Sequence, residues 1–408
     1  MKTAVVGLQW GDEGKGKVVD TLAEHYDTIV RFNGGPNAGH TIYFNDEKHV
    51  LHVIPSGIFS PGKHCLITGG VVLDLAKLVK EITGLQAKNV DCSKLRISPE
   101  CHLILPYHIL IDQIREGRKA KLGTTKSGIG PCYADKTARI GIRIKDLFSD
   151  ELLKEALQIN LEEKNPFIVS QGYLPLDAES LFDHLKSLRE SVSPYIGEVR
   201  GMIADPSKEC LFEGAQGAML DIDHGTYPFV TSSQAGYAGL LAGSGLSARE
   251  QVNVIGVIKA YNTRVGTGPF PTEDKSEVGE RIRTQGKEFG STTGRPRRCG
   301  WLDIPQLKYA IGLSGADTLV MTKLDVLSGL PEIKVCVDYE DGGNLPDWEK
   351  AIPKYISLPG FTLPDLVKGW VDLPKAARDF VHTVQDLAGL PITHLSLGPR
   401  RNDMIPTI

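Results

Sequence analysis

Short apolar runs alternate along the chain with longer segments in which apolar residues recur at helical spacing. Residues 3–8 form an apolar run rich in β-branched side chains, which predicts a strand. Residues 17–26 carry apolar positions at helical spacing, and residues 28–32 form a second apolar run. The chain therefore opens with a predicted β–α–β unit.

The same two patterns continue to the C-terminus. They predict strands at residues 65–68, 211–212, 252–261, 317–321 and 392–397, helices at 73–83 and 107–118, a hairpin of strands 42–44 and 50–54 about a turn at 45–48, and mostly helical structure over 145–200. Strands that alternate with helices indicate an α/β fold, with a mainly parallel central sheet and helices on both faces. Residues 340–375 are rich in proline and predict a surface excursion. No linker or repeat divides the chain, so a single domain over residues 1–408 is expected.

Composition and charge narrow the functional class. Of 408 residues, 41% are hydrophobic and 24% are charged, as in an ordinary globular protein. A net charge of −4 argues against a general nucleic-acid binder, and no apolar run approaches the ~20 residues that cross a bilayer. The N-terminus shows no signal-peptide pattern. Seven cysteines without a CxxC pair indicate free thiols and no zinc site, which predicts a cytoplasmic protein.

Residues 11–17, GDEGKGK, fit the phosphate-loop pattern GxxxxGK between the first strand and the first helix. In that setting backbone N–H groups and the helix N-terminus bind an anion, so a P-loop-NTPase-like site is predicted, with a tight structural turn as the alternative. Val18 stands where a Mg²⁺-binding Ser or Thr is usual, so the phosphate loop is atypical and another group must hold the metal. Phosphates would repel Asp12 unless it serves as metal ligand, general base or both; otherwise it caps the helix.

Three other segments carry candidate chemistry. His40 ends GPNAGH, a loop of small residues, where it is either catalytic or simply packed. Lys323 and Asp325 follow a buried strand in T-K-x-D. The carboxylate can accept two hydrogen bonds from guanine, and the lysine stem can cover the base. Residues 291–298, STTGRPRR, concentrate arginine forks that suit a dicarboxylic acid, unless they form a solvated basic loop.

These motifs together resemble the adenylosuccinate synthetase family. The resemblance is clearest in QWGDEGKGK at 9–17 and NGGPNAGH at 33–40, and extends from residue 3 to about residue 400. It implies GTP-dependent ligation of IMP and L-aspartate through a 6-phosphoryl-IMP intermediate, with Mg²⁺ as cofactor. The chain departs from the family form at Pro296, where a further basic residue is usual, and over residues 232–239.

The resemblance also implies a role for each matching residue. The catalytic set is Asp12 as general base, His40 as general acid, and Gln216 and Lys15, which stabilise charge; on sequence alone Gln216 could equally be a buried structural residue. The implied GTP-binding residues are Gly11, Asp12, Glu13, Gly14, Lys15, Gly16, Lys17, Gly39, His40, Thr41, Arg297, Lys323, Asp325, Ser396, Gly398 and Pro399. The IMP set is Asn37, Thr125, Arg139, Gln216, Thr231, Val265 and Arg295. The aspartate set is Thr292, Thr293, Arg295 and Arg297. Asp12 and the Gly39 carbonyl are the implied Mg²⁺ ligands.

The resemblance implies a homodimer in which Arg139 reaches the IMP phosphate of the other subunit, although on sequence alone such an arginine is more often a helix-surface residue. The expected partners are therefore GTP, IMP and L-aspartate, with neither nucleic acid nor membrane. Two other classes also fit a guanine-nucleotide site: a GTP-driven switch, and a small-molecule kinase that stops at a phosphorylated product. Phosphate release that depends on both IMP and aspartate distinguishes the three.

Overall fold

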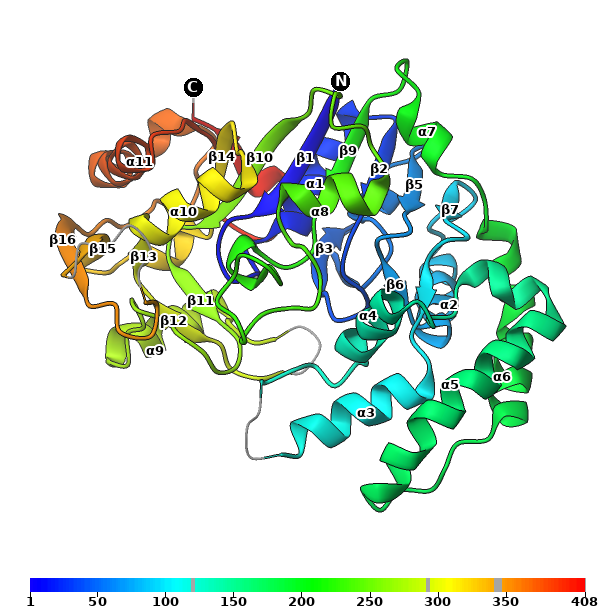
Figure 1. The fold of residues 1–408 in the computed structure, drawn as a ribbon. Helices are drawn as coiled ribbons and strands as arrows, with labels where there is room; N and C mark the ends of the chain where they lie inside the picture. The colour runs from blue at the N-terminus through cyan, green and yellow to red at the C-terminus, as the bar shows by residue number, and fades with distance from the viewer. Residues whose placement is uncertain (119–121, 291–293, 341–346, 408) are drawn as a thin grey trace.

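A mainly parallel sheet of nine strands forms the centre of the molecule (Figure 1). The computed structural model describes residues 1–118, 122–290, 294–340 and 347–407. In the sheet the strands run in the order β18 (Met404–Pro406), β17 (Ile392–Ser396), β14 (Thr318–Thr322), β10 (Asn253–Lys259), β1 (Lys2–Gly7), β9 (Cys210–Glu213), β2 (Thr28–Arg31), β5 (His64–Ile67) and β7 (Leu95–Ile97). Within this sheet β18 is antiparallel to β17, and the other neighbouring strands are parallel. The predicted fold class is confirmed.

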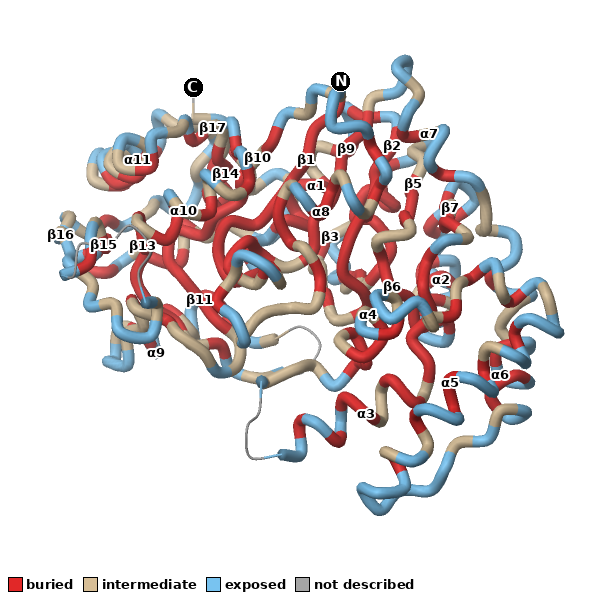
Figure 2. The backbone as a smooth tube through the Cα atoms, viewed as in Figure 1, coloured by how far each residue is buried: buried red, intermediate tan, exposed pale blue. Residues whose placement is uncertain are grey.

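The sheet is buried on both faces, which explains why its strands are near-continuous apolar runs. Along β1, Ala4 and Val6 belong to one hydrophobic cluster and Val5 to the other. The first cluster includes side chains of α8 (Tyr237–Ser244), α10 (Ile304–Ser314) and α11 (Lys375–Ala388), and the second includes side chains of α1 (Lys15–Leu22), α2 (Leu75–Gln86), α5 (Asp150–Ser170) and α6 (Ala178–Val192). Figure 2 shows the resulting buried band of strands.

Smaller elements flank the central sheet on both sides (Figure 1). Helices α3 (Pro106–Glu116), α4 (Ile129–Ala138) and α7 (Arg200–Ala204) and the strand pair β6 (Val72–Leu73) and β8 (His102–Leu103) lie towards β7. On the other side are α9 (Glu277–Gly286), the strand pair β11 (Asn262–Arg264) and β12 (Arg298–Gly300), and a three-stranded sheet of β13 (Leu302–Asp303), β15 (Glu332–Tyr339) and β16 (Pro353–Pro359). Within the described residues, no helix is both long and apolar enough to span a membrane.

Three sequence predictions need correction. Helix α1 begins at Lys15 instead of residue 17, because Gly14 takes a left-handed N-cap conformation with φ 90°, and it ends at Leu22 before a single 3-10 turn. The hairpin strands are β3 (His40–Phe44) and β4 (Glu47–Leu51), since two left-handed residues, 45 and 46, suffice for the turn. The excursion at 340–375 contains β16, an edge strand with proline at each end, as edge strands tolerate.

Candidate active site

The site residues lie at the carboxyl ends of neighbouring parallel strands in the middle of the sheet. From β17 to β2, these ends lead in order to Ser396, Lys323, Lys259, the loop at residues 8–14, Glu213 and the loop at residues 33–40. Ligands of open α/β sheets bind at this edge because the strand order lets loops separate there. The sheet therefore brings together predicted residues that lie far apart in the chain, such as Lys17 and Ser396, which are 379 positions apart.

The phosphate loop encloses the side-chain carboxylate of one of its own residues, Glu13. Gly11, Asp12 and Gly14 are all left-handed, with φ of 83°, 60° and 90°, so the backbone folds tightly around the fully buried Glu13. Its Oε1 accepts hydrogen bonds from the backbone N–H groups of Gln9 and Gly11 at 3.1 and 2.9 Å, and its Oε2 lies 2.6 Å from Nζ of Lys15. The N-cap of α1 is Gly14, so Asp12 does not cap this helix.

Two glycines make room for the Glu13 carboxylate. A Cβ added to Gly7 or to Gly217 would collide with its carboxylate oxygens. Gly7 ends β1, and Gly217 belongs to the loop that follows β9. The carboxylate is thus held between two strand ends, at a position where the loop's amides converge.

Lys17 contacts the loop that follows β17. Its Nζ donates to Oγ of Ser396 and to the carbonyl of Gly398, both at 2.6 Å, so these predicted GTP residues lie together. Burial lowers the pKa of Lys17 to about 8, although the charges of Asp403 and Asp325 oppose the shift. Both direct partners are uncharged oxygens, and no ion pair of Lys17 occurs among the described residues.

His40 lies against the phosphate loop. A Cβ added to Gly16 would stand 2.6 Å from Cβ of His40, so the imidazole packs on the first turn of α1. Nδ1 of His40 makes a short contact with Oε1 of the buried Glu213, which also lies 3.6 Å from Arg31 and accepts two hydrogen bonds from Ser56 at 2.7 Å. Figure 1 places β3, which begins at His40, beneath the end of β9.

The histidine and glutamate form a positioned dyad. Burial lowers the pKa of His40, and the Glu213 charge opposes that shift. Burial alone would raise the pKa of Glu213, but His40 and Arg31 bring it below its ordinary value. The sequence prediction missed Glu213, although a glutamate ending a buried strand beside a Gly-rich loop was a usable signal.

Gln216 and Asn37 lie together near this dyad. Nε2 of Gln216 donates to Oδ1 of Asn37 at 3.2 Å, and Gln216 is left-handed with φ 57°. Its buried Oε1 has no hydrogen-bond partner within the described part of the chain. A strained backbone with an unsatisfied buried oxygen is typical of a ligand-binding position rather than of a structural glutamine.

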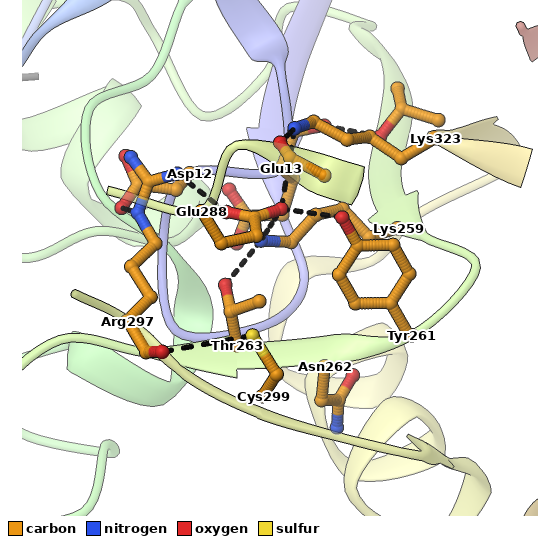
Figure 3. Close-up of polar contacts among 12 residues, drawn as sticks. Asp12, Glu13, Lys259, Tyr261, Asn262, Thr263, Glu288, Arg297, Cys299 and Lys323 are labelled. Carbon is orange, nitrogen blue, oxygen red and sulfur yellow. Dashed lines mark hydrogen bonds and ion pairs between the residues drawn. The ribbon is translucent and has the colours of Figure 1, made fainter. Parts of the chain in front are cut away.

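The arginine motif reaches the phosphate loop through Arg297. Its Nε lies 2.8 Å from Oδ2 of Asp12, and its second contact, at 2.5 Å, is with Oε2 of the buried Glu288 (Figure 3). Lys323 lies 3.3 Å from the same carboxylate and donates to the Gly286 carbonyl at 2.5 Å. Burial raises the pKa of half-buried Asp325, while Lys323 opposes the shift. Glu288 stands outside every motif recognised in the sequence, so sequence reasoning missed it.

The remaining predicted residues line neighbouring loops. An Nη of Arg295 donates to the Gly123 carbonyl at 3.4 Å, and Gly123 approaches Gly266, so the arginine motif, the Thr125 loop and the Val265 loop converge. Thr125 bonds to Ser127 at 3.1 Å, and the Thr231 amide donates to the Leu220 carbonyl at 2.8 Å. Arg139 is exposed at the C-cap of α4, away from these contacts. Thr292 and Thr293 lie outside the described residues.

Comparisons with known proteins agree on one family. Residues 4–405 match the family model described as adenylosuccinate synthetase. Curated relatives named adenylosuccinate synthetase from Stenotrophomonas maltophilia and Xanthomonas campestris pv. campestris are each 49% identical, over 98% of this chain and 96% of their own length. A solved structure titled fully ligated adenylosuccinate synthetase from Plasmodium falciparum is 38% identical, with a TM-score of 0.92 over 99% of both chains.

Proposed function

The chain belongs to the adenylosuccinate synthetase family, and from that premise we propose how its own residues carry out the reaction. The protein is a ligase of purine biosynthesis that joins IMP to L-aspartate and consumes GTP. The observation that supports our assignment is the packing of His40 on the phosphate loop, at the edge of the sheet where Asp12, Gln216 and Arg297 also lie. A phosphoryl donor and a purine oxygen could meet there.

In the first step Asp12 removes the proton from the purine ring nitrogen. The electron pair moves to the 6-oxygen, which attacks the γ-phosphorus of GTP as the bond to the β-phosphate oxygen breaks, giving 6-phosphoryl-IMP and GDP. The Asp12 side chain is 31% exposed and can reach a ligand, and Arg297 pairs with its carboxylate. This pair fixes the orientation of the carboxylate beside the phosphate loop.

His40 and Gln216 stabilise the charge that develops on the 6-oxygen. With Nδ1 directed at Glu213, a protonated His40 ring presents its Nε2–H on the opposite side, where a purine oxygen could accept it. A histidine whose pKa lies below its ordinary value is also a stronger acid. The Gln216 amide group adds a second donor once it exchanges its bond to Asn37.

In the second step the aspartate amine attacks carbon 6 of the phosphorylated purine. The new C–N bond forms as the C–O bond breaks, inorganic phosphate leaves, and the amine loses a proton. Arg295 and Arg297 hold the aspartate carboxylates through their forked N–H groups, and the neighbouring Thr292 and Thr293 complete this set in the proposal. Asp325 reads the guanine edge of GTP.

The donors for Mg²⁺ fit the chemistry of that ion. Asp12 would contribute a carboxylate and Gly39 a backbone carbonyl, and both are hard oxygen donors of the kind that Mg²⁺ prefers. Such a site needs no cluster of three acidic or histidine side chains, and none occurs within the described residues. Bound there, Mg²⁺ would neutralise charge on the phosphates of GTP.

The decisive experiment measures inorganic phosphate released from GTP with IMP and aspartate supplied together and singly. Release that requires both, with one adenylosuccinate formed per phosphate, supports the ligase. Release without aspartate would indicate a kinase or hydrolase. Release without either substrate would indicate a switch-type GTPase.

We also propose a homodimer with shared sites. Arg139 is exposed and left-handed, with φ 66°, at the end of the helix that follows the Thr125 loop. A bulky residue in this conformation is held for a reason, and a partner's IMP phosphate supplies one. Mixing Asp12→Asn with Arg139→Leu subunits should restore about one quarter of wild-type activity, because half the dimers are mixed and each has one intact site. No recovery after verified subunit exchange would refute sharing.

The proposal also covers the domain organisation of the protein and its cellular compartment. The described residues pack on both faces of one continuous sheet, which supports a single domain over the whole chain. All seven cysteines are buried and free, which supports a reducing compartment such as the cytoplasm.

A further inference from the structure

Glu288 is the only carboxylate that three cationic side chains of the described site share. Its side chain is fully buried, 3.3 Å from Nζ of Lys323, 3.4 Å from Nζ of Lys259 and 2.5 Å from Arg297. The hydroxyl of Tyr261 donates to it at 2.5 Å. Figure 3 shows these groups converging on the carboxylate from separate segments.

The backbone around Glu288 forms the base of the arginine loop. The Arg297 amide donates to the Glu288 carbonyl at 2.9 Å, and the Gly290 amide to the Arg295 carbonyl at 2.8 Å. The Glu288 side chain bonds to Arg297 across the same base. The loop that carries the proposed aspartate ligands is therefore fastened at Glu288 by both main chain and side chain.

The same carboxylate lies next to the lysine of the proposed guanine site. Lys323 is left-handed, with φ 60°, directly after β14, and its Nζ is held between Glu288 and the carbonyl of Gly286. This arrangement leaves the lysine stem in a defined position beside Asp325. A rigid stem loses less entropy when a base stacks on it.

We propose that Glu288 is a positioning residue that couples the guanine site to the aspartate site, by fixing Lys323 and Arg297 through one buried carboxylate. The inference rests on the roles assigned to Lys323 and Arg297 in the proposed function. Glu288 would act through its partners: Arg297 contacts both Glu288 and Asp12, and Lys323 contacts Glu288 from the end of β14.

Electrostatics explain why one carboxylate can couple two sites. Lys323, Lys259 and Arg297 would repel one another in a buried cluster that lacks an anion. Burial lowers the pKa of Lys259, and the charge of Glu288 opposes that shift. If the Glu288 charge is lost, Lys323 and Arg297 both lose a charge-assisted contact at the same time. Arg297 then keeps its pair with Asp12, and Lys323 keeps its bond to the Gly286 carbonyl.

The test compares Glu288→Gln, which keeps the shape and removes the charge, with a matched control. Glu273→Gln is that control, because Glu273 pairs with Arg298 at 2.6 Å in the neighbouring strand pair and makes no contact with Lys323 or Arg297. Tyr261→Phe serves as a second variant, since it removes one hydrogen bond to Glu288 and keeps every charge. Thermal unfolding confirms that each protein is folded.

Two measurements test the proposal, one at the guanine site and one at the aspartate site. Calorimetric titration with GDP reports the guanine site without turnover, and the KM for aspartate reports the arginine loop. Glu288→Gln should weaken both by about tenfold, as loss of one charged contact at each site predicts, with the KM for IMP within about twofold of wild type. Tyr261→Phe should move both in the same direction by less, and Glu273→Gln should move neither.

Other outcomes overturn the proposal. A folded Glu288→Gln with unchanged GDP affinity and unchanged KM for aspartate would show that Glu288 positions neither residue. Weakening at one site only would refute coupling, and equal weakening of IMP would indicate general loosening of the fold. If the proposed function is wrong, the wild-type protein does not ligate IMP and aspartate. The GDP titration still tests, by itself, whether Glu288 positions Lys323.

Discussion

Lys17 should take up a proton when a guanine nucleotide binds. Its Nζ is held by Ser396 Oγ and the Gly398 carbonyl, both neutral acceptors, in a position where burial lowers its pKa to about 8. A phosphate group next to it would supply the opposite charge that these partners lack. The phosphate would favour the charged lysine and raise its pKa, so binding and protonation are linked.

The size of the effect follows from the pKa of the free protein. At pH 8 about half of the Lys17 side chains are neutral, so binding should take up about 0.5 proton, whereas at pH 7 only about 0.1 proton is needed. Because the pKa of Lys17 is lowered in the free protein, the affinity for the nucleotide is constant below pH 7 and falls as the pH rises through 8. Between pH 8 and 9 the Kd should rise about fivefold, because the protonated fraction of Lys17 falls from about one half to about one tenth.

Calorimetric titration with GDP in two buffers of different ionisation enthalpy measures the proton uptake directly. The matched variant is Lys17→Arg, which keeps the positive charge and stays protonated throughout this range. It should bind GDP with a flat pH dependence and no uptake at pH 8. The reasoning fails if wild type takes up no proton at pH 8, or if Lys17→Arg takes up as much as wild type.

The remaining predictions concern the base, the acid and the nucleotide. Asp12→Asn should lower kcat by about 10²–10⁴-fold with little change in thermal unfolding, because the general base is lost, and steady-state turnover near wild type would exclude that role. Asp325→Asn should weaken GTP and favour xanthosine triphosphate, since the amide donates where xanthine carries a carbonyl; an unchanged ratio of the two kcat/KM values would contradict guanine reading. Glu213→Gln should lower the pKa of His40 further, because the anion that supports the charged ring is gone. The decline of kcat with rising pH should then begin at lower pH than in wild type, and a superimposable profile would show that Glu213 does not act through His40.

The fold was largely readable from the sequence because both faces of the sheet are buried. The centres of β1 and β10 are near-continuous apolar runs, and the glycine-rich phosphate loop marks where β1 stops. Element bounds were less readable, because they depend on single backbone conformations such as the left-handed Gly14 that starts α1. Strand β16 was not predicted, since an edge strand with alternating exposure and terminal prolines resembles a loop.

The site was readable only where its residues stand in compact motifs. Lys17, Lys323 and Ser396 each stand in a recognisable string: Lys17 in the first turn of α1, Lys323 directly after β14 and Ser396 at the end of β17. Lys17 and Ser396 contact each other. Glu213 and Glu288 were missed for the opposite reason. Glu213 has a local signal at the end of β9, but its role depends on His40, 173 residues away. Glu288 has no such signal, because its partners Lys259, Arg297 and Lys323 come from other segments of the chain.

The cationic side chains of the site differ in how readily they can bind a phosphate, and this difference affects which of them the nucleotide contacts first. Lys15 is paired with Glu13, and Arg297 with Asp12, so a nucleotide must displace a carboxylate to reach either. The direct partners of Lys17 are neutral oxygens, so a phosphate displaces no ion-paired carboxylate there. A phosphate that binds Lys15 breaks the buried ion pair with Glu13 as it forms a new one, whereas a phosphate that binds Lys17 forms an ion pair without breaking one. Nucleotide binding should therefore begin at Lys17, and the pairs within the phosphate loop should rearrange afterwards, when the metal and the purine are in place to compensate the released carboxylates.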